Sequence, residues 1–179
     1  MRLAAAAERI HGAGAEVIAI STDDDVRQAG MFGRWPTPHV QYVSDPGGET
    51  FLGPLGLFDA EERGGIALPG MLVIAPDGSE AYRYQGRDFA DRTTDEDVYA
   101  ALDALELDAV DAPTGGPVAD VPEDLGRFFS PEMFGPYFMG NKFGALAIQI
   151  RLGDDEARAI ANEHQVMADA SLQAWSSLQ

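Results

Sequence analysis

The chain has 179 residues, of which 45% are apolar, and its twelve basic and thirty acidic side chains give a formal net charge of −18. This length suits one domain of ordinary size, with or without a smaller appendage. Because the negative charge repels phosphate backbones and anionic lipid headgroups, we expect no nucleic-acid partner and no membrane partner. No apolar run approaches the roughly 18 residues that span a bilayer. The stretch at residues 1–7 is too short for a secretory signal and is followed too soon by polar residues, so we expect a cytoplasmic protein.

The chain contains no cysteine. Its own residues therefore form no disulfide, thiolate zinc site or iron–sulfur cluster, and they offer no cysteine nucleophile. The three histidines, His11, His39 and His164, do not stand at a two-histidine metal-binding spacing. We expect no metal and no cofactor.

The first half of the chain alternates between helical and extended patterns. Residues 2–11 have apolar side chains at helical spacing, and the apolar run 17–20 is typical of a buried parallel strand. Residues 21–23 offer an N-cap, with Asp24 and Asp25 in the first turn of a helix that ends at Trp35.

A second short strand is predicted over residues 39–43, followed by a turn. Residues 49–57 are a poor candidate for a helix because they contain two glycines and a proline. The apolar runs 71–74 and 81–85 flank the turn sequence Pro-Asp-Gly at 76–78, which predicts a β-hairpin. Residues 94–97 then predict the capped start of another helix.

Residues 111–122 are rich in proline, glycine, aspartate and alanine, which predicts a linker between a domain at 1–110 and an extension at 123–179. The extension is mostly helical in composition, most clearly over 156–178. Residues 145–152 alternate like a strand but have helical flanks, so we favour a helix and leave the strand as the alternative.

Four segments in the same order resemble the alkyl hydroperoxide reductase/thiol-specific antioxidant group, the peroxiredoxin-like redoxins: GAEVIAISTD at 14–23, VSDPGGE at 43–49, PGMLVIAPDG at 69–78 and YQGRD at 84–88. The resemblance covers roughly residues 1–107. It implies an α/β, thioredoxin-like fold followed by a mostly helical extension. It also implies a family role in thiol-dependent peroxide reduction or thiol–disulfide oxidoreduction.

The sequence departs from this family at the segment that carries the catalytic cysteine. The peroxidatic cysteine of the family opens the helix that precedes the first strand seen here, and we expect this chain to begin inside that helix. The family's preceding strand, an interior one, is missing too, so the thioredoxin-like fold is expected to be N-terminally incomplete. The absence of that strand would leave two strands with unpaired edges, which costs about 1–3 kcal/mol of stability for each unsatisfied backbone group. We therefore expect either more chain upstream or a substitute strand, from residues 145–152 or from a partner chain.

The resemblance also marks a pocket at Leu68 and Pro69. Pro69 resembles the family's cis-proline, which lines the thiol or substrate pocket; the alternative is a loop proline that starts a strand. Leu68 stands where many members have an arginine, and it can neither carry charge nor donate a hydrogen bond. We assign no catalytic residue and no metal ligand.

The remaining candidates have structural interpretations. Asp23, Asp24 and Asp25 fit a helix N-terminus better than a cation site, and residues 45–48 lack the lysine and hydroxyl of a phosphate loop. The aromatic and methionine cluster at 128–143 predicts packing or a surface for a homo-oligomer or protein partner. Two functions stay open: a piece of a longer thiol peroxidase, or a cysteine-free thioredoxin-fold binding or assembly module.

Overall fold

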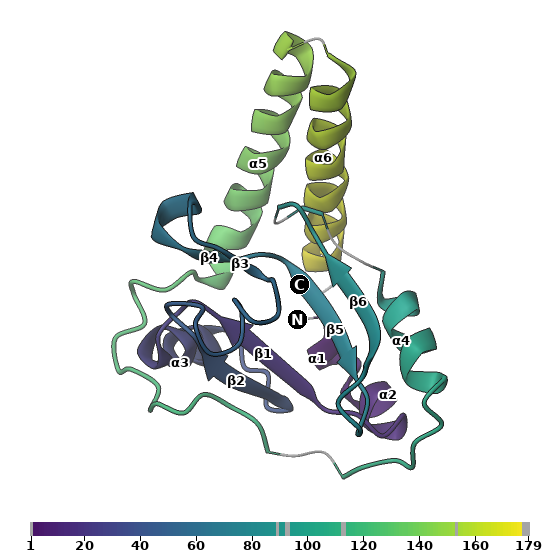
Figure 1. The fold of residues 1–179 in the computed structure, drawn as a ribbon. Coiled ribbons are helices and arrows are strands. Elements are labelled where there is room, and N and C mark those ends of the chain that lie inside the picture. Colours follow the sequence, from purple (N-terminus) through teal and green to yellow (C-terminus); the bar gives the residue numbers. More distant parts are fainter. Residues whose placement is uncertain (1, 89, 92–93, 112–113, 153, 177–179) are drawn as a thin grey trace. The chain divides into compact units, whose positions relative to one another are not determined.

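The computed structural model describes residues 2–88, 90–91, 94–111, 114–152 and 154–176 (Figure 1). The chain divides into two compact units, Met1–Phe128 and Phe129–Gln179. The first unit is mixed α/β and the second is a pair of helices, so the mixed class with a helical C-terminal part is confirmed.

The first unit opens with two short helices and a parallel pair of strands. Helices α1 (Arg2–Ala5) and α2 (Ala7–Gly12) cover the predicted helical segment 2–11 and end one residue beyond it. Strands β1 (Val17–Ser21) and β2 (Val40–Ser44) pair in parallel, in a register that places Val17 opposite Val40 and Ser21 opposite Ser44. A parallel pair needs a crossover, which helix α3 (Asp25–Arg34) supplies.

The start of α3 lies one residue later than the sequence pattern indicated. Asp24 is the N-cap, and its carboxylate accepts a hydrogen bond from the backbone N–H of Arg27 at 2.8 Å. Farther along the helix, Gln28 is buried and its side-chain amide donates to the carbonyl of Val43 at 2.9 Å. This bond ties α3 to β2.

The predicted hairpin is confirmed. Strands β5 (Gly70–Ile74) and β6 (Glu80–Gln85) are antiparallel, and Gly78 in the connecting turn has a φ of 86°, which glycine adopts without strain. Two short strands, β3 (Phe58–Asp59) and β4 (Ile66–Ala67), form a separate antiparallel pair around the 3₁₀ turn Glu62–Gly64.

Helix α4 (Asp95–Asp103) is capped as predicted, since the Thr94 hydroxyl accepts from the N–H of Asp97. It closes a core cluster with α2 and β5, made of Ile10, Ala13, Val73, Val98 and Leu102. Val17 of β1 and Met71 of β5 both pack against this cluster, so the two strands share one core.

Two sequence predictions for this unit are wrong. The apolar run 17–20 forms a parallel strand as predicted, but it is not a buried one: among the described strands β1 pairs with β2 alone, and Ile18 is 60% exposed. Residues 49–57 contain no helix in the structure and form consecutive turns. The predicted linker is irregular where it is described, residues 112–113 lying outside the described ranges; Gly115 donates to the Pro38 carbonyl at 2.7 Å.

The second unit consists of two antiparallel helices, α5 (Pro131–Leu152) and α6 (Asp155–Ser176). Residues 145–152 belong to α5, which confirms the helix and rules them out as the substitute strand. The prediction of a helix to Leu178 is confirmed as far as Ser176, beyond which the residues lie outside the described ranges. Aromatic rings of α5 and α6 pack together in this unit. The ring of Phe134 is stacked on that of Trp175, with 5.1 Å between the ring centroids.

Candidate functional site

Leu68 and Pro69 lie where the chain leads into β5, and both are half-buried. The N–H of Leu68 donates to the Leu57 carbonyl at 2.9 Å, and the carbonyl of Pro69 accepts from the Gly86 N–H at 2.7 Å. Neither residue lines the two cavities described below. Both are therefore held by backbone hydrogen bonds at the start of the hairpin.

The prediction of a cis bond before Pro69 is wrong, because the described residues contain no cis peptide bond. A trans proline fits this position, because Pro69 precedes β5 and its missing N–H breaks no bond of the β5–β6 ladder. The alternative interpretation, a loop proline that starts a strand, is the one that agrees with the structure.

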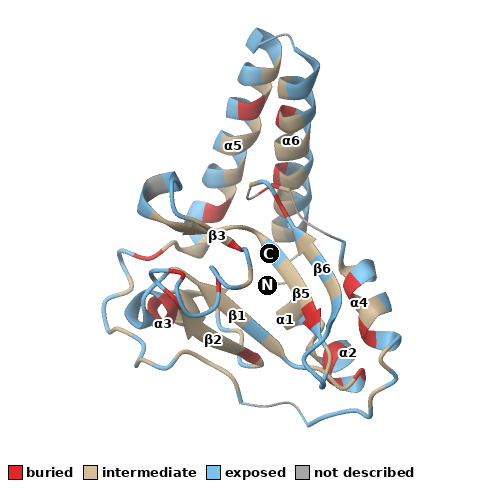
Figure 2. Cartoon of the chain, viewed as in Figure 1, coloured by how far each residue is buried: buried red, intermediate tan, exposed pale blue. Residues whose placement is uncertain are grey.

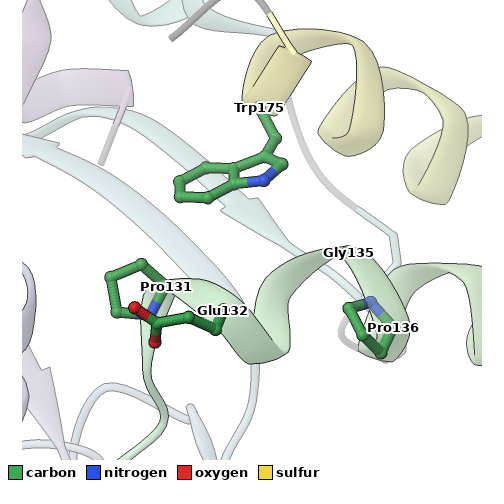
Figure 3. Close-up of a pocket in the computed structure, with 5 residues that line it drawn as sticks. All are labelled: Pro131, Glu132, Gly135, Pro136 and Trp175. Carbon is green, nitrogen blue, oxygen red and sulfur yellow. The ribbon is translucent and has the colours of Figure 1, made fainter. Parts of the chain in front are cut away.

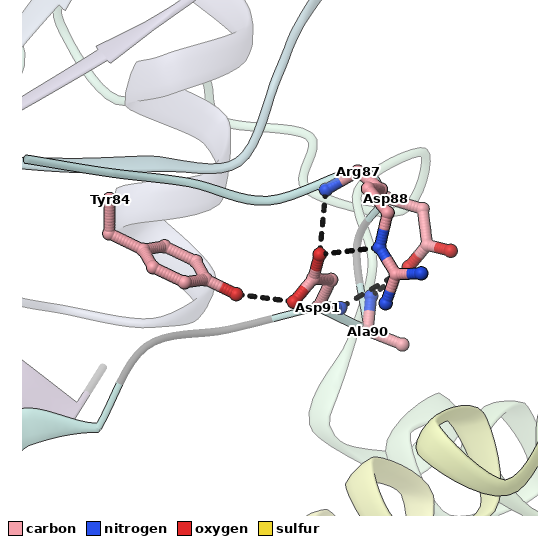
Figure 4. A network of polar contacts seen from close by, with 5 residues as sticks. All are labelled: Tyr84, Arg87, Asp88, Ala90 and Asp91. Carbon is pink, nitrogen blue, oxygen red and sulfur yellow. Dashed lines mark hydrogen bonds and ion pairs between the residues drawn. The ribbon is translucent and has the colours of Figure 1, made fainter. Parts of the chain in front are cut away.

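Close to Pro69, a polar network fixes the loop that follows β6 (Figure 4). The Asp91 carboxylate accepts from the Tyr84 hydroxyl, from the backbone N–H of Arg87 at 2.9 Å and from the Arg87 Nε at 3.0 Å. The Tyr84 hydroxyl, followed by the Arg87 backbone and guanidinium, lowers the pKa of Asp91 to about 2.

Such a carboxylate does not act as a general acid or base near neutral pH. A catalytic acid or base needs a pKa near the working pH, whereas Asp91 remains ionised and its oxygens are already occupied. We assign the network a structural role: it holds Arg87 and Asp91 against Tyr84 of the hairpin.

Asp45 organises the turns after β2 in a similar way. It is buried, and its carboxylate accepts from the backbone N–H groups of Thr50, Phe51 and Leu52 at 3.2, 2.9 and 2.8 Å. The N–H of Leu52 is the main reason that the pKa of Asp45 is lowered. In a phosphate loop, backbone N–H groups of this kind would bind the phosphate. Here the carboxylate of Asp45 occupies them, which agrees with the interpretation of 45–48 as a turn.

Two of the histidines meet inside the first unit. The rings of His11 and His39 are 5.6 Å apart in an edge-to-face arrangement. Within the described part of the chain, His11 Nε2 and His39 Nδ1 are buried without a hydrogen-bond partner. The described residues contain no group of three or more potential metal ligands.

Two cavities are described. One, of about 370 Å³, lies within the helical pair and is lined by Pro131, Glu132, Gly135, Pro136 and Trp175 (Figure 3). The other, of about 160 Å³, lies between α2 and α4, where Arg9 and Asp103 form an ion pair on its wall. Neither wall contains a serine, threonine, histidine or lysine side chain, so neither places a hydroxyl nucleophile beside a basic group.

The most distinctive surface of the first unit is the second edge of β1. Among the described strands, β1 is hydrogen-bonded to β2 alone and β5 to β6 alone. The carbonyl of Ser21 accepts from the N–H of Asp45, so Ser21 faces β2. Because backbone groups alternate along a strand, Ala19 also faces β2, whereas the backbone groups of Ile18 and Ile20 face the open edge.

The sequence indicated this edge only through the family resemblance, which predicted two strands with unpaired edges. The apolar residue type of Ile18 does not predict that it is 60% exposed; part of β1 is coloured as exposed in Figure 2.

No described helix is both long enough and apolar enough to cross a membrane. Comparisons with protein-family models, with curated proteins and with solved structures find no match for this chain.

Proposed function

We propose that the chain is a cysteine-free, redoxin-like binding module whose first unit accepts an extended segment of a protein partner. The proposal combines the resemblance of residues 1–107 to the redoxins with one structural observation: the open edge of β1. A thioredoxin-like arrangement with an interior strand left vacant would produce such an edge.

The chemistry of this edge suits strand addition. An open edge presents unpaired N–H and C=O groups, which another chain can satisfy by adding a strand. The segment Val-Ile-Ala-Ile carries no charge, proline or bulge that would discourage pairing. Since Val17 and Met71 pack on one core cluster, an added strand at β1 would extend the layer that already covers this core.

The negative charge of the first unit favours a partner segment that carries basic residues. Met1–Phe128 holds nine basic and twenty-four acidic side chains, a net charge of −15. A partner segment with apolar residues in alternation and basic residues at its ends would gain from both the open edge and the surrounding field.

Amide hydrogen exchange on the full chain tests the proposal. The N–H groups of Ala19 and Ser21 are expected to be protected, and those of Ile18 and Ile20 to exchange fast. The probe is a ten-residue peptide of alternating valine and threonine with a lysine at each end. Its addition should slow exchange at Ile18 and Ile20, while a peptide with proline at alternate positions should not.

Two results would overturn the proposal. One is protection of Ile18 and Ile20 in the chain alone, because the edge would then already be paired. The other is a lack of protection at millimolar probe. An Ile18→Pro variant, which removes a donor from the open edge, should lose the effect of the peptide on Ile20.

The resemblance also carries a second candidate, thiol-dependent peroxide reduction. The sequence contains no thiol, so this chemistry would need a cysteine from elsewhere. Purified chain with dithiothreitol and hydrogen peroxide should show no peroxide loss above the uncatalysed rate. Turnover would refute the binding-module proposal in its non-catalytic form.

A further inference from the structure

The cavity of the helical pair lies where α5 begins and α6 ends. Pro131 and Glu132 are in the first turn of α5, and Trp175 is in the last described turn of α6. Because the helices are antiparallel, these two turns meet, and Gly135 and Pro136 complete the wall. The volume of about 370 Å³ falls within the range of small-molecule sites.

Part of the Trp175 indole faces this cavity. Phe134 is stacked on the indole, with 5.1 Å between the ring centroids and 28° between the ring planes, and it is not among the described residues that line the cavity. The cavity therefore meets a part of the indole that Phe134 leaves uncovered. Figure 3 shows the indole reaching from α6 toward the first turn of α5, where Pro131 and Glu132 lie. An aromatic face held in this way attracts cations.

The wall of the cavity is negatively charged. Among the described residues that line it, Glu132 alone carries a charge. The basic residues of this unit lie elsewhere: they are Lys142, Arg151 and Arg158. The start of α5 adds a partial positive charge of about half a unit, and the end of α6 a partial negative charge of about the same size, so the two helix ends nearly cancel. The full charge of Glu132 therefore decides the sign, and the wall attracts a cation.

The backbone of α5 adds a hydrogen-bond acceptor to this wall. In a regular helix the carbonyl of Glu132 would accept from the N–H of residue 136, but Pro136 has no N–H. Both residues line the cavity, so this carbonyl lies at its wall. Pro131 has no N–H either, which leaves the wall poor in donors for an anion. A ligand that donates several hydrogen bonds fits this wall better than one that accepts them.

We propose that the cavity binds a guanidinium group, carried by a free small molecule or by an arginine residue of a peptide. A guanidinium is planar and stacks on an indole, and its fork of N–H donors matches the two oxygens of a carboxylate. It keeps further N–H groups for the carbonyl of Glu132. An ammonium group carries the same charge but has no flat face, so we expect it to bind less well. The inference is independent of strand addition at β1.

NMR of the isotope-labelled full chain tests the proposal. The indole N–H signals of Trp35 and Trp175 are assigned with a Trp175→Phe variant, which lacks the second of them. The probe is N-acetyl-arginine amide, whose only charge is the guanidinium. It should shift the indole signal of Trp175 and the amide signal of Gly135, and leave the indole signal of Trp35 unchanged. For a ligand of this size we expect a dissociation constant of about 0.5 mM.

Two further probes separate the contributions of charge and shape. N-acetyl-citrulline amide has nearly the shape of the arginine probe but no charge, and it should cause no shift. N-acetyl-lysine amide has the charge without the plane, and it should bind at least about threefold more weakly. Free arginine identifies the source of the ligand. Tighter binding of the blocked probe assigns the cavity to an arginine residue of a peptide, and tighter binding of the free amino acid assigns it to a small molecule.

Three substitutions at exposed positions test the wall itself. Glu132→Gln should weaken binding of the arginine probe about fivefold. Glu156→Gln is the matched control, because it removes the same charge from the first turn of the other helix, at the opposite end of the pair, and should bind as the wild type does. Pro136→Ala returns an N–H to α5, so it should stabilise the helix and still weaken binding. A loss of binding in this variant therefore does not reflect unfolding.

Unchanged signals of Trp175 and Gly135 at the highest concentration of the arginine probe would overturn the inference. Equal shifts with the citrulline or lysine probe, equal effects of Glu132→Gln and Glu156→Gln, or tighter binding by Pro136→Ala would also overturn it. Ile18→Pro should bind the arginine probe as the wild type does, so failure of this site and failure of strand addition are distinguishable.

Discussion

A pair of proline substitutions in β1 distinguishes its two edges. Ala19→Pro removes an N–H that points to β2, because Ser21 faces β2 and backbone groups alternate along the strand. Ile18→Pro removes an N–H that points to the open edge. The two substitutions occur at adjacent positions of one strand and introduce the same ring.

The expected costs differ several-fold. Ala19→Pro breaks a bond of the ladder, leaves a carbonyl of β2 without its donor and places the ring between the strands, for a total of about 3 kcal/mol. Ile18→Pro breaks no bond of the ladder and replaces a side chain that is 60% exposed, so we expect less than about 1 kcal/mol. The difference corresponds to at least a factor of about 30 in the unfolding equilibrium.

Urea unfolding followed by tryptophan fluorescence measures both costs. The chain has two tryptophans, Trp35 in the first unit and Trp175 in the second. In a Trp175→Phe background, Trp35 reports the first unit alone. Equal destabilisation by Ile18→Pro and Ala19→Pro would refute the reasoning, because it would mean that both edges of β1 are already paired.

Three further results are expected. Leu102→Ala should destabilise the first unit by about 2–5 kcal/mol in the same urea assay, because it empties a buried position of the core cluster. The lowered pKa of Asp91 contributes about 2 kcal/mol of stability above pH 5, which is lost as the pH falls from about 4 to 2; Asp91→Asn should flatten that part of the stability curve. Asp45→Ala should accelerate amide exchange at Leu52, which loses its acceptor, while exchange at Val98 stays slow. Unchanged exchange at Leu52 would contradict the role of Asp45.

Local signals in the sequence predicted the elements whose structure is decided locally. The β5–β6 hairpin follows from the turn residues ending at Gly78, and α4 follows from the capping hydroxyl of Thr94. The N-cap of α3 was misplaced by one residue, since Ser21, Thr22, Asp23 and Asp24 are all capable caps and the strand pairing decides among them.

Features that depend on distant partners were not predictable in this way. The sequence of residues 49–57 does not indicate that their N–H groups will donate to the carboxylate of Asp45 and that the segment will form turns in place of a helix. Similarly, the apolar run of β1 is typical of a buried strand, and only the pairing shows that one edge is open. For the candidate site, the resemblance predicted a cis peptide bond before Pro69, whereas the described residues contain none.

The proline inside α5 has a consequence for how the second unit opens. Pro136 has no N–H to donate to the carbonyl of Glu132, so the first turn of α5 lacks a hydrogen bond that would join it to the rest of the helix. Stacking of Phe134 on Trp175 is one contact that holds this turn to α6, and both Pro136 and Trp175 line the adjacent cavity. A missing hydrogen bond of α5 therefore lies beside the wall of the cavity, and we expect fraying of this first turn to widen the cavity while the rest of both helices stays intact.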